Sequence, residues 1–366
     1  MIMAFLLTAL LSGHAVAERT AAGTEFIFPV TPKAIPGGVF QVLVAAGEAG
    51  TATVSVPGLD FSRQVTLVPG TVARVSPPHK AYSDLTHDTV KNRSLHVLAD
   101  VPVKVYVEQF LSKNSDAFLA LPVQGLGKRY RTVSYIALSR STVTITATED
   151  DTRVTITPGD NTVGHPDGVP FDVLLDRFES YHLVGRTTYY FDENQIRDLS
   201  GSLIVADKPV AVGSGNGCTY VPYRVPSCDH LTEMMPPVES WGRRVMTAPL
   251  AGRLAGDLIR VMADEDDTVV FRNGEELARL SAGEYIDTIV AEPSLFEAEK
   301  PILVTQYSVG QAFDRTATDP FMMIAVPAEQ YLGSYTVSTA KAGFSANYLG
   351  LIIPASAVDT ISLDGG

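Results

Sequence analysis

The sequence predicts an all-β protein made of tandem repeats of about 100 residues, each an antiparallel, β-sandwich-like unit. The first observation is a phrase Ala-(Asp or Glu)-X-Pro followed by alternating apolar residues, which occurs three times. Its copies lie in Leu95–Val107, Leu203–Ser214 and Phe296–Tyr307. The second observation is a recurring turn, rich in acidic residues or Gly, that precedes alternating apolar residues. The third is that helix-period apolar runs with capping residues are nearly absent.

The phrase at Asp207, Lys208 and Pro209 predicts a tight turn that joins two strands, because apolar and β-branched residues flank it on both sides. Proline has a fixed φ angle and no N–H group, so a turn or the first residue of a strand suits it. We therefore expect equivalent tight turns at Asp100 and Glu299 in the other copies.

The acidic or Gly-rich turn predicts a second hairpin in each repeat. Its copies are Ala46–Val56, Ala147–Ile156, Ala263–Phe271 and Ala355–Leu363, with Thr51, Thr152, Thr268 and Thr360 as the repeated threonine. A variable hairpin follows, which is Phe171–Leu175 with Ser180–Val184 in the second copy. Each repeat then has about seven strands, a number that fits one β-sandwich.

A third phrase begins with an aspartate and contains a proline, and it leads into each later repeat at Asp116, Asp229 and Asp319. We expect these carboxylates to act locally, as acceptors of backbone N–H groups where the chain crosses between repeats. Three equivalent carboxylates in three separate repeats do not suit catalysis.

These phrases divide the chain into a leader and four repeats. The predicted ranges are 1–17 for a signal peptide, 18–115, 116–228 and 229–318 for three β repeats, and 319–366 for a truncated fourth repeat. A propeller blade normally uses four strands in fewer residues. Sandwich-like units are therefore the first interpretation, and a propeller-like ring of elaborated blades is the alternative.

The first 17 residues are typical of a secretory signal peptide, with a short apolar core at Phe5–Leu11 and a small-X-small pattern that ends at Ala17. The alternative is a buried first strand. The apolar run is too short to span a membrane as a helix, which needs about 20 residues. We therefore expect a secreted or cell-surface protein with no membrane span.

The net charge and the cysteine content limit which kinds of partner and bound group we expect. A formal charge of −13 makes a nucleic-acid partner improbable on electrostatic grounds. The two cysteines, Cys218 and Cys228, are expected to form a disulfide in an oxidising compartment and to cover a seam between the second and third repeats. The alternative is two free, buried thiols. We expect no bound metal and no cofactor, because two cysteines without nearby histidines do not complete a zinc site.

The acidic turns Glu149–Asp151 and Asp264–Asp267 raise the question of calcium, which carboxylate and carbonyl oxygens bind. Solvated turns whose charges protect a sheet edge are the alternative, and no EF-hand pattern favours calcium. No nucleophile, phosphate-binding or metalloprotease motif occurs either. The sequence therefore predicts a protein that is not an enzyme.

Several phrases together resemble the N-terminal domain of the IgGFc-binding protein family. They are Asp116–Val123 with Leu126, Gly127 and Tyr130, Ala147–Thr152, Asp207–Val212, Cys228–Leu231, and Pro236–Val238 with Trp241 and Gly242. The resemblance covers most of the chain from about residue 25. It implies a secreted or surface protein, and in that family the N-terminal domain is credited with binding the Fc part of IgG. No short Fc-contact motif can be assigned to residues of this chain.

The first function hypothesis is a non-enzymatic binding and adhesion module for an extracellular protein or glycoprotein. A purely structural extracellular β-repeat protein is the second, and a hydrolase of extracellular glycans, which would need two carboxylates facing one cleft, is the third. Binding residues concentrate on loops that a rigid scaffold holds. The aromatic side chains of two divergent segments, 185–198 and 215–227, are therefore the candidate binding residues: Tyr189, Tyr190, Tyr220 and Tyr223.

Overall fold

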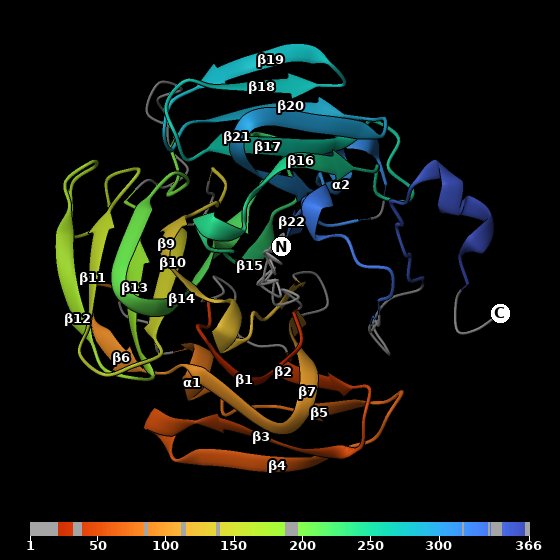
Figure 1. Cartoon of the computed structure of the whole chain (residues 1–366). Helices are drawn as coiled ribbons and strands as arrows, with labels where there is room; N and C mark the ends of the chain where they lie inside the picture. The colour runs from red at the N-terminus through yellow and green to blue at the C-terminus, as the bar shows by residue number, and fades with distance from the viewer. Residues whose placement is uncertain are drawn as a thin grey trace, which may run out of the picture.

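The computed structural model describes residues 21–31, 39–83, 87–110, 115–136, 140–186, 197–316, 318–335, 337 and 346–362. These residues form three curled antiparallel sheets, which follow one another along the chain and occupy three sides of the molecule (Figure 1). The all-β class and the antiparallel repeats are thus confirmed. The predicted signal peptide lies outside the described residues.

Each sheet contains seven strands from one stretch of chain. The first has β1 (Gly23–Phe28), β2 (Val39–Ala46), β3 (Gly50–Val56), β4 (Phe61–Leu67), β5 (Val72–Val75), β7 (Leu95–Phe110) and β8 (Asp116–Leu119). The second has β9 (Gly127–Arg131), β10 (Ser141–Ala147), β11 (Thr152–Thr157), β12 (Phe171–Leu175), β13 (Glu179–Val184), β14 (Leu203–Thr219) and β15 (Asp229–Met234). The third has β16 (Gly242–Thr247), β17 (Asp257–Ala263), β18 (Thr268–Arg272), β19 (Glu275–Leu280), β20 (Tyr285–Val290), β21 (Ser294–Tyr307) and β22 (Met322–Ile324).

Short elements complete the chain. An eighth strand of the second sheet, β6 (Val90–Asn92), comes from the β5–β7 connection of the first repeat and pairs with β13. The helices are α1 (Lys80–Ser83) and α2 (Gln311–Asp314), and the 3-10 helices are η1 (Pro57–Leu59), η2 (Val123–Gly125), η3 (Val238–Ser240), η4 (Ala328–Gln330) and η5 (Ala355–Thr360). The predicted repeat boundaries at residues 115, 228 and 318 stay predictions, and the last strand of each sheet lies just beyond them.

The expected tight turns at the Asp-X-Pro phrases are wrong. Leu203–Thr219 is one continuous strand, and β7 and β21 run through the matching phrases in the same way. The first half of β14 pairs with β9 and β11, and its second half pairs with β10 and β15. The β9 register shifts between Val205 and Val210, on either side of Pro209. Because proline cannot donate a ladder hydrogen bond, the phrase bends one strand instead of joining two.

The acidic turn is not a hairpin either. Both β10 and β11 are antiparallel to β14, at successive stretches of it, so they run in the same direction. Residues 148–151 make a short detour between them, opposite the bend in β14. Lys208 Nζ donates to the carbonyl oxygens of Asp150 and Asp151, and the Arg153 N–H donates to Asp207 Oδ1 over 2.9 Å. These hydrogen bonds therefore join the detour to the bend, and the two occur together.

Equivalent residues of the three sheets follow from the hydrogen-bond register. The aligned pairs are Ala52 with Ala99, Val154 with Ala206, and Val270 with Ala298. Asp100, Asp207 and Glu299 thus lie at equivalent positions, as the repeat interpretation requires. Gly50, and not Thr51, corresponds to Thr152 and Thr268. A Cβ atom on Gly50 would lie 2.4 Å from Asp100 Oδ1, so a larger residue there would have to displace the Asp100 side chain.

The strands that end the three sheets meet near the centre of the molecule, where β15 contacts both β8 and β22 (Figure 1). Asp116 Oδ2 accepts the Thr232 N–H over 2.8 Å, and Asp229 Oδ2 accepts the Ser115 N–H over 3.3 Å. The predicted local role of these two carboxylates, between repeats, is confirmed. Their positions differ, because Asp229 lies five residues before the end of β15 and Asp116 only three before the end of β8.

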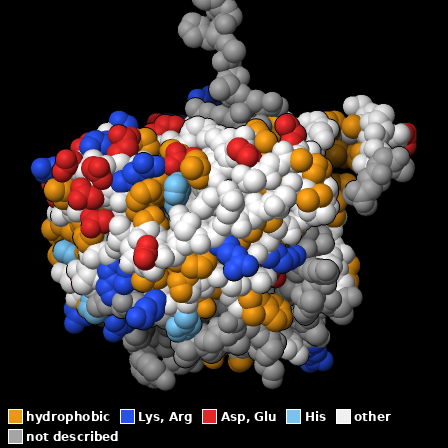
Figure 2. All heavy atoms as spheres, turned by 90° about the horizontal axis from the view of Figure 1, so that it is seen from below, with side chains coloured by type: hydrophobic (Ala, Val, Ile, Leu, Met, Phe, Trp, Pro, Cys, Tyr) orange, Lys and Arg blue, Asp and Glu red, His pale blue; other side chains and the backbone are white. Residues whose placement is uncertain are grey.

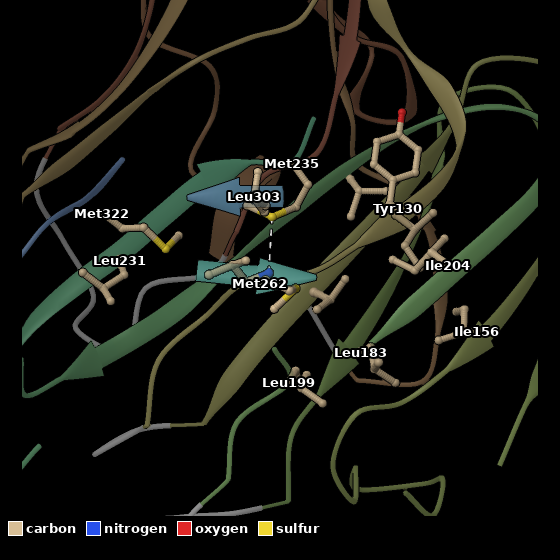
Figure 3. Close-up of a cluster of buried hydrophobic side chains, with 14 of the residues drawn as sticks. Tyr130, Ile156, Leu183, Leu199, Ile204, Leu231, Met235, Met262, Leu303 and Met322 are labelled. Carbon is tan, nitrogen blue, oxygen red and sulfur yellow. Dashed lines mark hydrogen bonds between the residues drawn. The ribbon is translucent and has the colours of Figure 1, made fainter. Parts of the chain in front are cut away.

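One hydrophobic core is shared by the second and third sheets. Ile204 and Leu183 of the second sheet belong to the same buried cluster as Met262 and Leu303 of the third (Figure 3). The first sheet has its own core, to which the second repeat adds Ala211 and Met234 among the buried residues, and the third sheet has a separate buried cluster that includes Val261 and Phe296. The second and third repeats therefore form one body in the described chain.

A buried arginine joins these two repeats. The Arg260 side chain on β17 is fully buried and donates to both carboxylate oxygens of Asp287 at 2.8 Å. It also reaches across the seam to Asp198 Oδ2 at 3.1 Å and to the Ser134 carbonyl oxygen at 3.0 Å. Its guanidinium lies 3.8 Å from the ring centre of Tyr285, a cation–π contact. Every hydrogen bond here is charge-assisted, so the contact fixes the seam.

The predicted fourth repeat forms no sheet of its own in its described residues, and its strand β22 belongs to the third sheet. Ala355–Thr360, where a hairpin was expected, is the 3-10 helix η5, and residues 346–362 lie to one side of the three sheets (Figure 1). The expected hairpin is therefore wrong at this position. Isolated hairpins are only marginally stable without further strands to pack against.

Replacing Arg260 by Met should lower the free energy of unfolding by about 3–5 kcal/mol, because it leaves the Asp198 carboxylate buried without its partner. Urea unfolding of the purified protein measures the change. Arg279→Met is the control, since Arg279 makes an exposed ion pair with Asp267. Its effect should stay within about 0.5 kcal/mol. Equal losses for the two variants would contradict the assignment.

Candidate functional site

Several loops leave the second sheet at one end, where β10 begins and β13 and β14 finish. Thr142 of β10 pairs with Val184 on one side and with Gly215 on the other. The divergent segments 185–198 and 215–227 therefore begin on the two strands that flank the start of β10. We call this the loop end of the second sheet. The two divergent segments singled out in the sequence thus share one end of one sheet.

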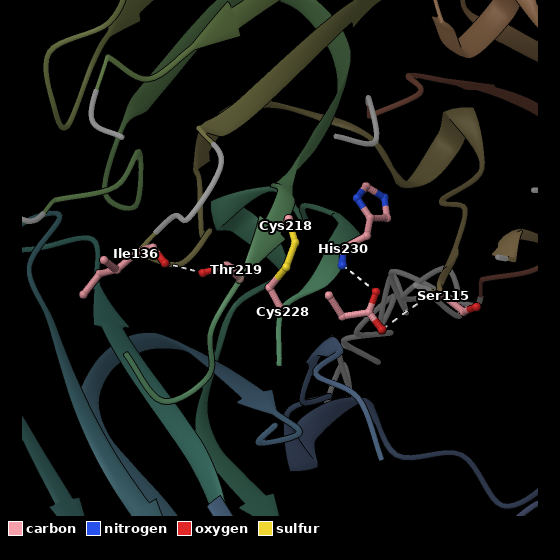
Figure 4. Close-up of a disulfide and its surroundings, with 7 residues drawn as sticks. Ser115, Ile136, Cys218, Thr219, Cys228 and His230 are labelled. Carbon is pink, nitrogen blue, oxygen red and sulfur yellow. Dashed lines mark hydrogen bonds between the residues drawn. A yellow bond between two sulfur atoms is a disulfide. The ribbon is translucent and has the colours of Figure 1, made fainter. Parts of the chain in front are cut away.

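The disulfide at the loop end is present. Cys218 and Cys228 are bridged, with their Cα atoms 5.4 Å apart, and the bridge closes the loop between β14 and β15 (Figure 4). The Val221 carbonyl oxygen in this loop accepts the Gly310 N–H over 2.6 Å. Gly310 belongs to the third repeat, so the predicted position across the seam is confirmed.

The candidate tyrosines fall into two groups. Tyr189 and Tyr190 lie outside the described residues. Tyr220 and Tyr223 are in the disulfide loop and are half-buried. Tyr223 packs against the shared core, its N–H donates to the Tyr135 hydroxyl over 3.4 Å, and the Arg224 guanidinium lies 5.3 Å from its ring centre. Tyr223 thus holds the loop, and its role in binding stays a prediction.

Sequence reasoning missed two exposed arginines at the loop end, Arg140 and Arg186. Arg140 immediately precedes β10, and Arg186 immediately follows Gly185. No local motif distinguishes either residue. Only the pairing of β10 with β13, which joins residues far apart in sequence, brings them together.

The carboxylates at the centre test the hydrolase hypothesis. Asp116 and Asp229 come from different strands and are 8% and 0% exposed. Each carboxylate accepts backbone N–H groups, from Ala117 and Thr232 and from His230 and Ser115 respectively. Burial raises the pKa of Asp116 well above its usual range. This arrangement is typical of structural carboxylates and offers no open cleft for a sugar.

The part of the chain that the structure describes contains no group of three or more His, Cys, Asp or Glu side chains placed to hold a metal ion. In the same residues, no helix is long and apolar enough to cross a membrane.

A shallow hollow of about 620 Å³ lies on the third sheet. Its lining is Arg243, Arg244, Phe271, Glu297, Ala298, Glu299 and Glu329. The positions that match Arg244 in the first two sheets are Glu25 and Arg129, which pair with Arg177 and Asp264 of the next repeat. The hollow thus corresponds to a surface on which the preceding sheets contact their neighbours, so we do not assign it a ligand.

Comparison with known proteins identifies the family. The family model described as IgGFc binding protein matches residues 116–366, which is more than half of the chain. The chain belongs to the IgGFc-binding protein family. The human protein named IgGFc-binding protein is 23% identical over 312 residues, which cover 82% of this chain and 6% of the human protein. The chain therefore spans a small part of that relative, and the activity of the whole relative does not transfer directly.

The disulfide should stabilise the folded protein by about 2–3 kcal/mol, the loss of loop-closure entropy expected for a loop this short. The double variant Cys218→Ser with Cys228→Ser should show that loss in urea unfolding. Mass spectrometry of the purified parent protein should find no thiol that can be alkylated before reduction. Two alkylatable thiols would contradict the bridge.

Glu233 on β15 should make stability fall as pH rises from about 4.5 to about 8, because burial raises the pKa of its carboxyl to about 8 in the folded protein. The folded state keeps a proton that the unfolded chain releases near pH 4.5, so this contribution is complete below that pH and is lost as pH rises through 8. Replacing Glu233 by Gln should flatten the profile of unfolding free energy against pH. Replacing it by Met, the residue found at the equivalent position 323 of the third sheet, should do the same.

Exposed Glu276 provides the control, since Glu276→Gln should leave the slope of the parent unchanged. Urea unfolding at about pH 5 and about pH 8 is sufficient for the comparison. Parallel pH profiles for the parent and Glu233→Gln would show that another group causes the slope.

Proposed function

We propose that this chain is a secreted or cell-surface, non-enzymatic binding and adhesion module that engages an extracellular protein or glycoprotein with the loop end of the second sheet. The observation that carries the proposal is the disulfide loop, which a covalent bridge and the Gly310 hydrogen bond fix on a rigid seam. Preorganised loops bind with a smaller entropy cost than mobile ones.

Differences between repeats support the same location. The β13–β14 connection of the second repeat contains residues 185–202, whereas the matching β20–β21 connection of the third repeat contains only residues 291–293. The fold of the repeat therefore does not require a long connection at this end. Loops that vary on a constant scaffold are where binding residues concentrate.

The apolar pattern of residues 1–17 supports export, as does a disulfide that needs an oxidising compartment. The human relative carries the name of an IgG Fc-binding protein, so the Fc fragment of IgG is a reasonable first probe. Purified gel-forming mucin is a second, because it represents the extracellular glycoproteins. A purely structural extracellular role is the competing function.

Replacing Tyr220 and Tyr223 by Ser should weaken binding to whichever probe the parent binds by about tenfold or more, because buried aromatic anchors dominate interfaces. Surface plasmon resonance with immobilised Fc or mucin gives the affinities, and thermal unfolding reports whether the variant is folded. Adding Tyr189→Ser and Tyr190→Ser tests the other two candidates. Tyr348→Ser is a matched control at a tyrosine that is 73% exposed elsewhere.

Unchanged binding by a folded variant would place the site outside the loop end. Failure of the parent to bind either probe would favour the purely structural role.

A further inference from the structure

Arg140 and Arg186 form a pair of like charges at the loop end. The register of β10 with β13, in which Thr142 lies opposite Val184, continues through the Gly185 N–H that donates to the Ser141 carbonyl oxygen over 2.9 Å. Extended by one more residue, this register places Arg140 opposite Arg186. Like charges directly opposite on neighbouring strands are destabilising.

No neighbouring acid offsets this repulsion in the described chain. Both arginines are exposed, and neither guanidinium has a hydrogen-bond or ion-pair partner among the described residues. Arg197, another exposed arginine at this end, is different, because it pairs with Asp167 at 2.7 Å. The free charges of Arg140 and Arg186 also stand out in a chain whose formal charge is −13.

The fold does not need arginine at either position. The hydrogen-bond registers place Val39 and Pro78 at the matching positions of the first repeat, and Gly256 and Ala291 at those of the third. Three repeats thus share the backbone while only the second has the two charges. A like-charge pair that no described residue neutralises is a candidate for an anionic ligand.

We propose that Arg140 and Arg186 together bind an anionic group, a sulfate or a carboxylate, on an extracellular glycan. Guanidinium groups recognise such oxyanions through paired N–H donors, and two of them opposite each other can hold one group from both sides. The exposed residue Asn161 lies beside Arg186, whose N–H donates to the Asn161 carbonyl oxygen. A polar neighbour suits sugar hydroxyls better than the apolar centre of a protein interface does.

On the face seen in Figure 2, acidic and basic side chains mix at the upper left, while Lys, Arg and His gather at the lower left. The Arg63 control described below tests whether basic groups of the first sheet bind anions equally well. This inference rests on the proposed binding function and names the chemistry of its ligand.

The test measures binding of the purified chain to chondroitin sulfate, chemically desulfated chondroitin and hyaluronan by isothermal titration calorimetry. Arg140→Glu and Arg186→Glu should each reduce affinity at least about tenfold, as expected for loss of a charge-assisted contact. Arg63→Glu is the matched control, because Arg63 is an exposed arginine of the first sheet with the same change in charge. Arg140→Lys and Arg186→Lys should restore part of the affinity, and added salt should weaken binding by the parent.

Loss with chondroitin sulfate alone assigns a sulfate, and equal loss with hyaluronan assigns a carboxylate; both support the proposal. Equal weakening by Arg63→Glu, no binding of any of the three glycans, or equally tight binding of polyglutamate would overturn it. Arg186→Ala, which introduces the residue of the third repeat, should melt no lower than the parent, so a folding defect does not obscure the result. If Arg140→Glu and Arg186→Glu both leave binding to Fc or mucin unchanged, this inference is overturned and the proposed function remains.

Discussion

A proline that cannot donate a hydrogen bond interrupts the longest strand of every sheet, and the rest of each repeat depends on how that interruption is accommodated. At the first bend, the N–H and hydroxyl of Thr51 donate to Asp100 and lower the pKa of that carboxyl. At the second, Lys208 donates to the opposite strand, and Lys300 does the same at the third. The bend lets one strand pair with different neighbours along its two halves, and so one strand organises a curled sheet.

The contacts between repeats then decide how rigidly the loop end is held. Between the second and third repeats, apolar packing is continuous and Arg260 adds a buried ionic contact to Asp198. Arg129 and Arg131 reinforce the same seam through Asp264, at 2.9 and 2.8 Å. A buried ion pair costs desolvation, so its value here is to fix one relative placement of the two repeats. The disulfide loop contacts this seam through Val221, and this contact fixes its position.

The sequence alone was sufficient for the all-β class, the repeats, the number of strands and the disulfide, because alternation, recurrence and cysteine spacing are local signals. It failed at Asp207–Pro209 and at residues 148–151, where each phrase reads as a turn. The phrase has the same local chemistry in a turn and in a strand bend, and only pairing with a distant strand separates the two. Gly50 is a second example, because its equivalence to Thr152 follows from the hydrogen-bond register and could not be read from the amino-acid sequence. The arginine pair could not have been found, because it exists only across a strand pairing.

Repeats of one architecture allow each position to be judged against its own counterparts in the same molecule. Where the counterparts share a contact, as at Asp100 and Asp207, the fold accounts for the residue. Where one repeat alone carries a residue that lowers stability, the fold does not account for it. Glu233 is such a residue, since Phe118 and Met323 fill the matching positions, but it is held at the centre among other repeats and reaches no loop. We expect the two arginines of the loop end to lower stability as well, but they face solvent, where a ligand can supply the opposite charge.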